Sequence, residues 1–214
     1  MPVRTGNRSF IELQKLVTKI LNPETMQCQN FKCLSVLLFF FLVYAKANAQ
    51  DTSFRFKSSG GIVGYGHEIN IDTRYNPIFF AGDFSWQFGK EKRKDFLAFY
   101  LEPQFNLVAT VRPLDIEFGT NVGLRYYQQL SSKFYFYQML GSGPHFITAD
   151  LPHQAKGFIF SDNLAVGFYK QVSEEKSLFL NFQFRVRHIS NAGLKLPNSG
   201  VNTLNVLVGL AKFR

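Results

Sequence analysis

The feature that most constrains the fold of this chain is an alternation of apolar and polar side chains with a period of two residues. It recurs in eight segments after residue 50, and turn-forming or charged residues separate the segments. The expected strands span residues 54–66, 76–88, 96–109, 114–127, 133–147, 157–170, 177–190 and 202–213. Eight consecutive strands joined by hairpins predict an all-β fold, an eight-stranded antiparallel up-and-down β-barrel.

The two faces of the expected strands differ strongly in polarity. In the segment 177–190, the even-numbered residues up to Val186 are apolar, whereas Asn181, Gln183, Arg185 and Arg187 alternate with them. Parity alone leaves two alternatives, a transmembrane barrel with its apolar face outside and a soluble lipid-carrying barrel with that face inside. The lysines favour the transmembrane barrel, because they stand at segment ends and in turns.

A transmembrane barrel implies a polar lumen and aromatic residues near the membrane interfaces. We expect Arg185 and Arg187 to pair with lumen acids such as Glu102 and Glu117. Aromatic clusters near strand ends are typical of an interfacial girdle, and the sequence offers Tyr126 with Tyr127 and the run 134–137.

The first 49 residues form a separate segment with the pattern of a secretory signal peptide. Lys32 precedes an apolar run that ends in Ala47, Asn48 and Ala49, which predicts cleavage after Ala49. The run is shorter than the roughly 20 residues of a transmembrane helix. The true start is expected at Met26, and the alternative is a cytoplasmic extension over residues 1–25. The predicted organisation is therefore residues 1–49 followed by a barrel over residues 50–214.

Composition excludes several classes of function. Cys28 and Cys33 both lie in the removed segment, so the exported chain has no disulfide or thiolate site. Lys and Arg number 24 against 15 Asp and Glu, an excess that suits an anionic membrane surface, and no nucleic-acid motif accompanies it. No metal-binding or phosphate-cradling motif is visible, so neither a metal nor a cofactor is expected. His145 and His153 have no partner at ligand spacing and are interpreted as surface loop residues.

Three polar residues occupy apolar-face positions at one end of the last two strands. His188 and Ser190 continue the even-numbered series of Phe184 and Val186, and Asn202 shares parity with the apolar residues of the following strand. Residues opposite each other in a hairpin have Cβ atoms about 4.5–5.5 Å apart, so the three side chains can cluster outside the barrel. A hydroxyl beside an imidazole that a third group orients is the arrangement of an activated serine nucleophile. The alternative is a strand that bulges or ends near His188, with both side chains touching lipid headgroups.

The stretch from Arg187 to Gly200, RHISNAGLKLPNSG, closely resembles the signature of the lipid A 3-O-deacylase (PagL) family of eight-stranded outer-membrane esterases. The resemblance implies that Ser190 attacks an ester carbonyl and that His188 takes its proton. It implies oxyanion donors in the following loop, for which Asn198 and the backbone of Gly193 are the candidates. It also implies an active site on the barrel exterior, which parity indicates independently.

The chain departs from this family at the third catalytic position, where the family has a glutamate and this sequence has Asn202. An amide can hold an imidazole but supplies no negative charge, and a carboxylate-to-amide exchange in one serine triad costs roughly 10⁴ in rate. Asp162 is the possible alternative acidic partner, since it shares the even series of its strand with Phe160 and Leu164. The competing interpretation is a local bulge that turns Asp162 into the lumen.

The sequence thus predicts a serine esterase of the outer membrane of a Gram-negative bacterium that removes an ester-linked acyl chain from lipid A. Its partners would be lipopolysaccharide in the outer leaflet and the membrane itself, and a homodimer is left open. The alternative function is a non-catalytic structural barrel that keeps the signature without activity.

Overall fold

A computed structural model of the chain describes residues 54–69, 74–89, 94–111 and 114–214. The expected signal peptide and the start at Met26 lie outside these residues and stay predictions. The described residues form nine strands: β1 (Phe54–Glu68), β2 (Asn76–Phe88), β3 (Asp95–Ala109), β4 (Asp115–Ser131), β5 (Phe134–Ser142), β6 (Pro144–Ile147), β7 (Gly157–Ser173), β8 (Leu178–Ser190) and β9 (Val201–Phe213). Within the same residues, no helix has the length and hydropathy that a membrane span requires.

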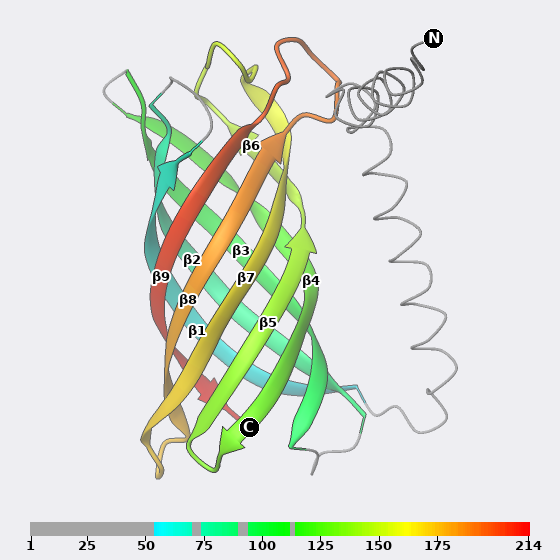
Figure 1. The fold of residues 1–214 in the computed structure, drawn as a ribbon, viewed down its shortest axis with the longest axis vertical. Coiled ribbons are helices and arrows are strands. Elements are labelled where there is room, and N and C mark those ends of the chain that lie inside the picture. The colour runs from blue at the N-terminus through cyan, green and yellow to red at the C-terminus, as the bar shows by residue number, and fades with distance from the viewer. Residues whose placement is uncertain (1–53, 70–73, 90–93, 112–113) are drawn as a thin grey trace, which may run out of the picture. The chain divides into compact units, whose positions relative to one another are not determined.

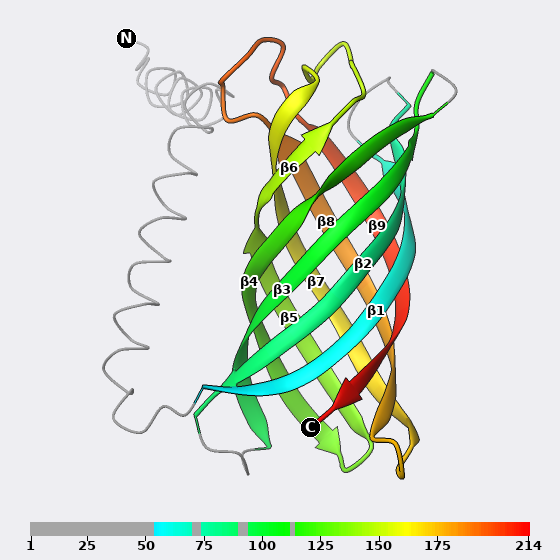
Figure 2. The same cartoon turned by 180° about the vertical axis from the view of Figure 1, so that it is seen from behind.

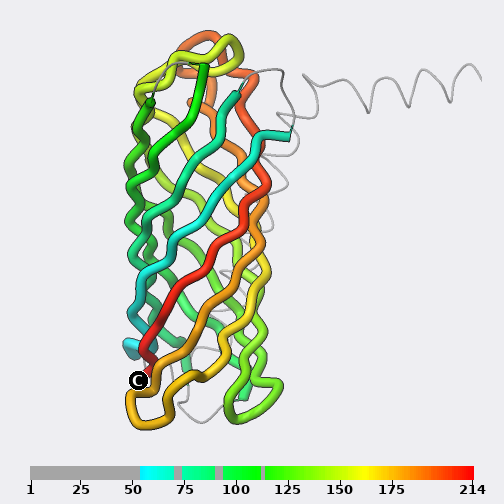
Figure 3. Tube along the Cα trace, turned by 90° about the vertical axis from the view of Figure 1, so that its left-hand side faces the viewer, coloured from blue at the N-terminus to red at the C-terminus, as the bar shows by residue number. Residues whose placement is uncertain are grey.

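The strands close into a barrel because β1 pairs antiparallel with both β2 and β9 (Figures 1 and 3). β5 and β6 both lie between β4 and β7, and their registers with these neighbours continue across the break at Gly143. They therefore occupy one position in the wall, and the barrel has the eight antiparallel positions that the alternation predicted. The fold prediction is confirmed, and the segment expected as one strand over residues 133–147 is interrupted only at Gly143.

The two ends of the barrel differ in the length of their connections (Figures 1 and 2). Residues 132–133 and 174–177 make short turns at the end where the chain terminates, whereas residues 148–156 and 191–200 make longer loops at the other end. Short periplasmic turns and longer extracellular loops are typical of outer-membrane barrels. The C-terminal end of β8 and the start of β9 therefore lie at the extracellular rim.

Apolar side chains cover the outside of the wall. The exposed large residues alternate along the strands with buried neighbours, and they include Phe80, Phe105, Phe118, Phe184, Val206 and Leu210. A band of this kind suits hydrocarbon rather than water. The alternative of a soluble carrier with an apolar interior is therefore wrong.

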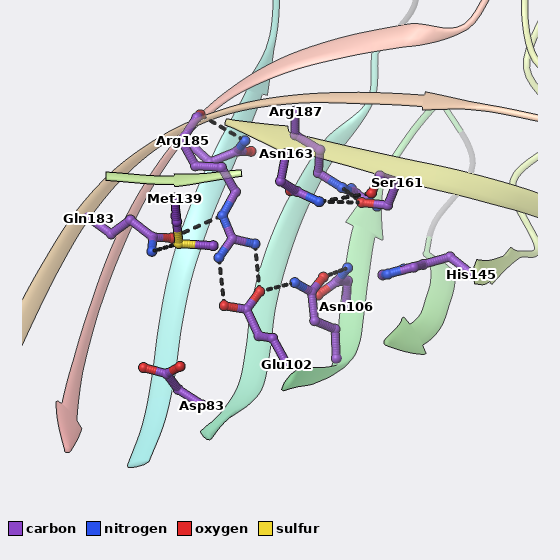
Figure 4. Close-up of polar contacts among 12 residues, drawn as sticks. Asp83, Glu102, Asn106, Met139, His145, Ser161, Asn163, Gln183, Arg185 and Arg187 are labelled. Carbon is purple, nitrogen blue, oxygen red and sulfur yellow. Dashed lines mark hydrogen bonds and ion pairs between the residues drawn. The ribbon is translucent and has the colours of Figure 1, made fainter. Parts of the chain in front are cut away.

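Ion pairs and amides fill the middle of the lumen (Figure 4). Arg185 pairs with Glu102 at 2.7 Å, Arg187 pairs with Glu117, and Arg125 pairs with Asp83 at 2.9 Å. All three arginines are buried, and each has the carboxylate partner that a buried charge needs. The pairing predicted for Arg185 and Arg187 is confirmed.

Three residues lie inside the barrel where the sequence analysis placed them elsewhere. His145 is on β6, 2% exposed, with Nδ1 2.6 Å from Glu117 Oε1, so its interpretation as a surface loop residue is wrong. Tyr127 and Tyr137 are fully buried rather than interfacial, whereas Tyr126 is exposed. Adjacent residues on a strand point to opposite faces, which puts only one of each neighbouring aromatic pair outside. His153 is exposed in the loop 148–156, as expected.

Apolar clusters lie on either side of this polar layer. The cluster toward the short turns contains Phe96, Tyr127, Tyr137, Tyr169 and Phe213. The cluster beneath the extracellular rim contains Tyr75, Val108, Ile147, Ile159, Ile189 and Val201. Because side chains pack the interior from end to end, the outer surface is where a lipid can meet this protein.

Candidate active site

The polar residues at the rim end of β8 point away from the lumen. His188 and Ser190 are half-buried and share the outer face with Phe184 and Val186, whereas Arg187 and Ile189 between them are buried inside. β8 continues without a bulge as far as Ser190, pairing residue by residue with β7 and β9. The strand therefore neither bulges nor ends at His188, and it ends two residues later, at Ser190.

Asn202 on β9 holds the imidazole from one side. It is the direct ladder partner of His188, and its Oδ1 lies 2.7 Å from His188 Nδ1. A carbonyl oxygen only accepts, so Nδ1 carries the proton and donates it to Asn202. The lone pair of the imidazole is then on Nε2, so Nε2 is the atom that can accept a proton as a general base.

Gly200 makes room for the imidazole on the side of Ser190. The β8–β9 ladder pairs Ile189 with Val201, so Gly200 lies across from Ser190. A Cβ at Gly200 would stand 2.9 Å from His188 Nε2 and nearer still to Cε1, and the residue has φ +75°. The ring edge that carries Nε2 therefore extends over Gly200, toward the level of Ser190. Among the described residues, none makes a hydrogen bond with the Ser190 side chain; catalytic bonds are often long in proteins without substrate.

Asp162 on β7 lies on the other side of His188, in a part of the strand whose register with β8 is continuous. It is exposed on the outer face and is the direct ladder partner of His188, so the interpretation that turned it into the lumen is wrong. Its Oδ1 accepts a hydrogen bond of 2.5 Å from the hydroxyl of Ser142 on β5. Ser142, Asp162, His188 and Asn202 therefore form a polar row across the outer face of four neighbouring strands.

The loop 191–200 is organised around the Asn191 side chain. Asn191 Oδ1 accepts from the backbone N–H of Gly193 at 3.0 Å, and its Nδ2 donates to the Lys195 carbonyl at 2.6 Å. The N–H that the sequence analysis assigned to an oxyanion at Gly193 is thus already bonded within the loop. Asn198 accepts the Asn191 N–H through Oδ1 at 2.7 Å, which leaves the amide NH₂ of Asn198 as the donor that can face a ligand.

The two long loops at the rim are joined to each other. The Ala155 N–H donates to the Pro197 carbonyl at 2.9 Å, and the Ser199 N–H donates to the His153 carbonyl at 2.8 Å. These bonds fix the backbone on either side of Asn198 relative to the loop 148–156. No group of three metal-ligating side chains occurs in the described part of the chain.

Two further residues of this region, Ser142 and Gly200, could not be recognised from the sequence alternation. Ser142 lies on the outer face at the end of β5. The break at Gly143 directly after it interrupts the alternation, so its position could not be read from the sequence. Gly200 was not predicted as a site residue, because its contact with the His188 imidazole is visible only in the folded structure. A glycine directly before the last strand was the available signal for close approach of a neighbouring group.

An antiparallel barrel with an apolar outside, a packed polar lumen and an exterior histidine–serine pair defines an outer-membrane barrel with a candidate hydrolytic site. A sequence model of the lipid A 3-O-deacylase (PagL) family matches residues 43–211. The chain belongs to this family, and it is a protein of the Gram-negative outer membrane.

Solved structures show the same fold at low sequence identity. The crystal structure of the outer membrane enzyme PagL is 15% identical and has a TM-score of 0.50, covering 71% of this chain and 97% of that one. The crystal structure of Neisserial surface protein A (NspA) is 12% identical with a TM-score of 0.51, covering 76% and 99%. A comparison with functionally curated protein sequences finds no match.

Proposed function

We propose that this chain is a serine esterase that removes an ester-linked acyl chain from lipid A at the outer surface of the barrel. The family supports the substrate class. The observation that carries the proposal is the outward-facing imidazole of His188, which is bonded at Nδ1 to Asn202 and extends over Gly200 toward the level of Ser190.

In the first step, the Ser190 hydroxyl gives its proton to His188 Nε2 as its oxygen bonds to the ester carbonyl carbon. The tetrahedral intermediate then breaks its bond to the alcohol oxygen of the ester. That oxygen takes the proton from His188 and leaves as a hydroxyl, and the acyl group stays on Ser190. Water repeats the sequence on the acyl-enzyme and releases the fatty acid. Asn202 holds the tautomer that this exchange of protons requires.

The oxyanion of the intermediate needs a hydrogen-bond donor in the loop above Ser190. We assign this role to the amide NH₂ of Asn198, whose orientation is set by the bond that its oxygen accepts from Asn191. The Gly193 N–H does not take this role, because it already donates to Asn191 Oδ1. Removal of one oxyanion donor typically lowers kcat by about 10²–10³.

An exterior site suits a substrate that is itself part of the membrane. Acyl chains of the outer leaflet surround the apolar side chains below His188, so the ester approaches Ser190 by lateral diffusion. No passage through the packed lumen is needed.

The experiment that tests this function compares the wild type with Ser190→Ala, using purified barrel in detergent with lipid A and mass spectrometry of the products. We expect a loss of hydrolysis of about a thousandfold or more in Ser190→Ala. Ser132→Ala in a turn at the opposite end is the matched control and should keep full activity. Equal product from the wild type and Ser190→Ala would refute the proposed function.

The second candidate function is a structural barrel without activity, and the amide at Asn202 is the observation that favours it. Without a carboxylate on Nδ1, the imidazolium of the transition state lacks its usual counter-charge. A wild-type barrel that folds in detergent and yet releases no fatty acid above background would favour this candidate.

A further inference from the structure

An acidic side chain stands beside His188 on the strand opposite Asn202. Asp162 is exposed on the outer face of β7 and is the direct ladder partner of His188. Cβ atoms of such partners lie about 4.5–5.5 Å apart. One carboxylate oxygen accepts from Ser142 Oγ at 2.5 Å, and a carboxylate keeps further acceptor sites on its second oxygen.

Among the described residues, the other outer-face neighbours of the imidazole on the two flanking strands carry no negative charge. On the β7 side, Phe160 and Leu164 flank Asp162 on the outer face. On the β9 side, Gly200 and Leu204 flank Asn202. The charged or titratable residues of the two joined rim loops are Asp150, His153, Lys156 and Lys195. Asp162 is therefore the carboxylate that the described neighbouring strands present to His188.

We propose that Asp162 is a positioning residue that supplies the negative charge missing at Asn202 and stabilises the His188 imidazolium. The proposal rests on the serine esterase function proposed above. The two roles of a triad acid are divided here: Asn202 fixes the tautomer through Nδ1, and Asp162 provides the charge from the opposite strand. Apolar side chains and lipid surround the site, so a charge at this distance is screened less than in water.

The hydrogen bond from Ser142 has a function in this arrangement. It holds an exposed carboxylate at the membrane face and fixes its orientation relative to the β7–β8 ladder. Asn at position 162 can still accept this hydrogen bond through its amide oxygen. Asp162→Asn therefore removes the charge while leaving the contact in place.

The first test is the kinetics of Asp162→Asn on lipid A in detergent. We expect kcat to fall roughly tenfold to a hundredfold, less than the ~10⁴ of a carboxylate bonded directly to the imidazole. Asp150→Asn, which removes an exposed acid of the rim loop 148–156, is the matched control and should leave kcat unchanged.

The second test is rescue by a carboxylate on the other side of the ring. Asn202→Glu in the Asp162→Asn background should restore kcat to the wild-type level or above, because the charge then lies directly on Nδ1. A purely structural role for Asp162 would not be rescued from β9.

The outcomes separate this inference from the function on which it depends. Wild-type kcat in Asp162→Asn would overturn the role of Asp162 while leaving the esterase in place. A loss of activity that Asn202→Glu does not restore would overturn it as well. Wild-type product from Ser190→Ala would overturn the esterase itself.

Discussion

At the scale of single residues, the candidate site depends on how closely the backbone approaches one imidazole. His188 has a hydrogen-bonding partner on β9, and its ring passes over a residue without a side chain. A methyl group at position 200 would meet the ring, and the left-handed backbone there favours glycine in any case.

Gly200→Ala should therefore lower kcat by tenfold or more, because the imidazole has to leave its position above residue 200. Gly89→Ala is the matched control: Gly89 also has a positive φ, +87°, but a Cβ there meets nothing within 4 Å. Both variants bear similar backbone strain, and only the first should lose activity in the mass-spectrometric assay. Equal kcat in the two variants would contradict the placement of the ring.

At the scale of elements, the loop 191–200 is held by the side chain of its first residue. Asn191 is 2% exposed and bonds to the backbone at both Gly193 and Lys195. In the proposed mechanism this loop supplies Asn198 as the oxyanion donor, so the order of the loop should affect activity.

Asn191→Ala should loosen this loop and leave the barrel wall unchanged. We expect faster hydrogen exchange at the Gly193 and Lys195 amides and a lower kcat, with wild-type exchange in the amides of β8 as the internal control. Unchanged protection at Gly193 would show that other contacts order the loop.

At the scale of the whole molecule, the buried ion pairs make the barrel sensitive to loss of a lumen charge. Glu117 accepts hydrogen bonds from Arg187, from Tyr75 at 2.5 Å and from His145, so it links three parts of the wall. Removing one partner of a buried pair leaves the other charge uncompensated.

Glu117→Gln should lower the free energy of unfolding by about 3–5 kcal/mol. Urea unfolding in micelles, followed by the fluorescence of the single tryptophan, Trp86, measures this loss. The control is Glu174→Gln at the turn 174–177, where the nearby Lys133 ammonium lowers the pKa of an exposed carboxylate. Exposed pairs contribute little, so this control should leave the midpoint unchanged. A Glu117→Gln midpoint equal to that of the control would contradict the account of the lumen.

Most of the fold can be predicted from the sequence, because an alternation of apolar and polar residues identifies both a strand and its two faces. The observed bounds of β2 match the predicted ones, and β8 differs by one residue at its start. The same parity placed His188, Ser190 and Asn202 outside the wall. It also placed Asp162 outside, and the local bulge of the competing interpretation does not exist.

The remaining features depend on contacts that have no periodic signal. The N–H of Gly193 is satisfied by Asn191 because of the loop's own turns, which strand alternation does not describe. His145 looked solitary in sequence, yet its partner Glu117 is supplied by the neighbouring strand β4. Pairings of this kind follow from register, which becomes visible once the barrel is closed.

Covalent labelling of the folded barrel with a fluorophosphonate, followed by mass spectrometry of the labelled peptide, tests whether Ser190 is an activated nucleophile. An activated serine on the outer face predicts one label on Ser190, its loss in His188→Ala, and protection by added lipid A. Release of fatty acid from lipid A by a barrel that labels at another residue, or that labels equally without His188, would contradict the account.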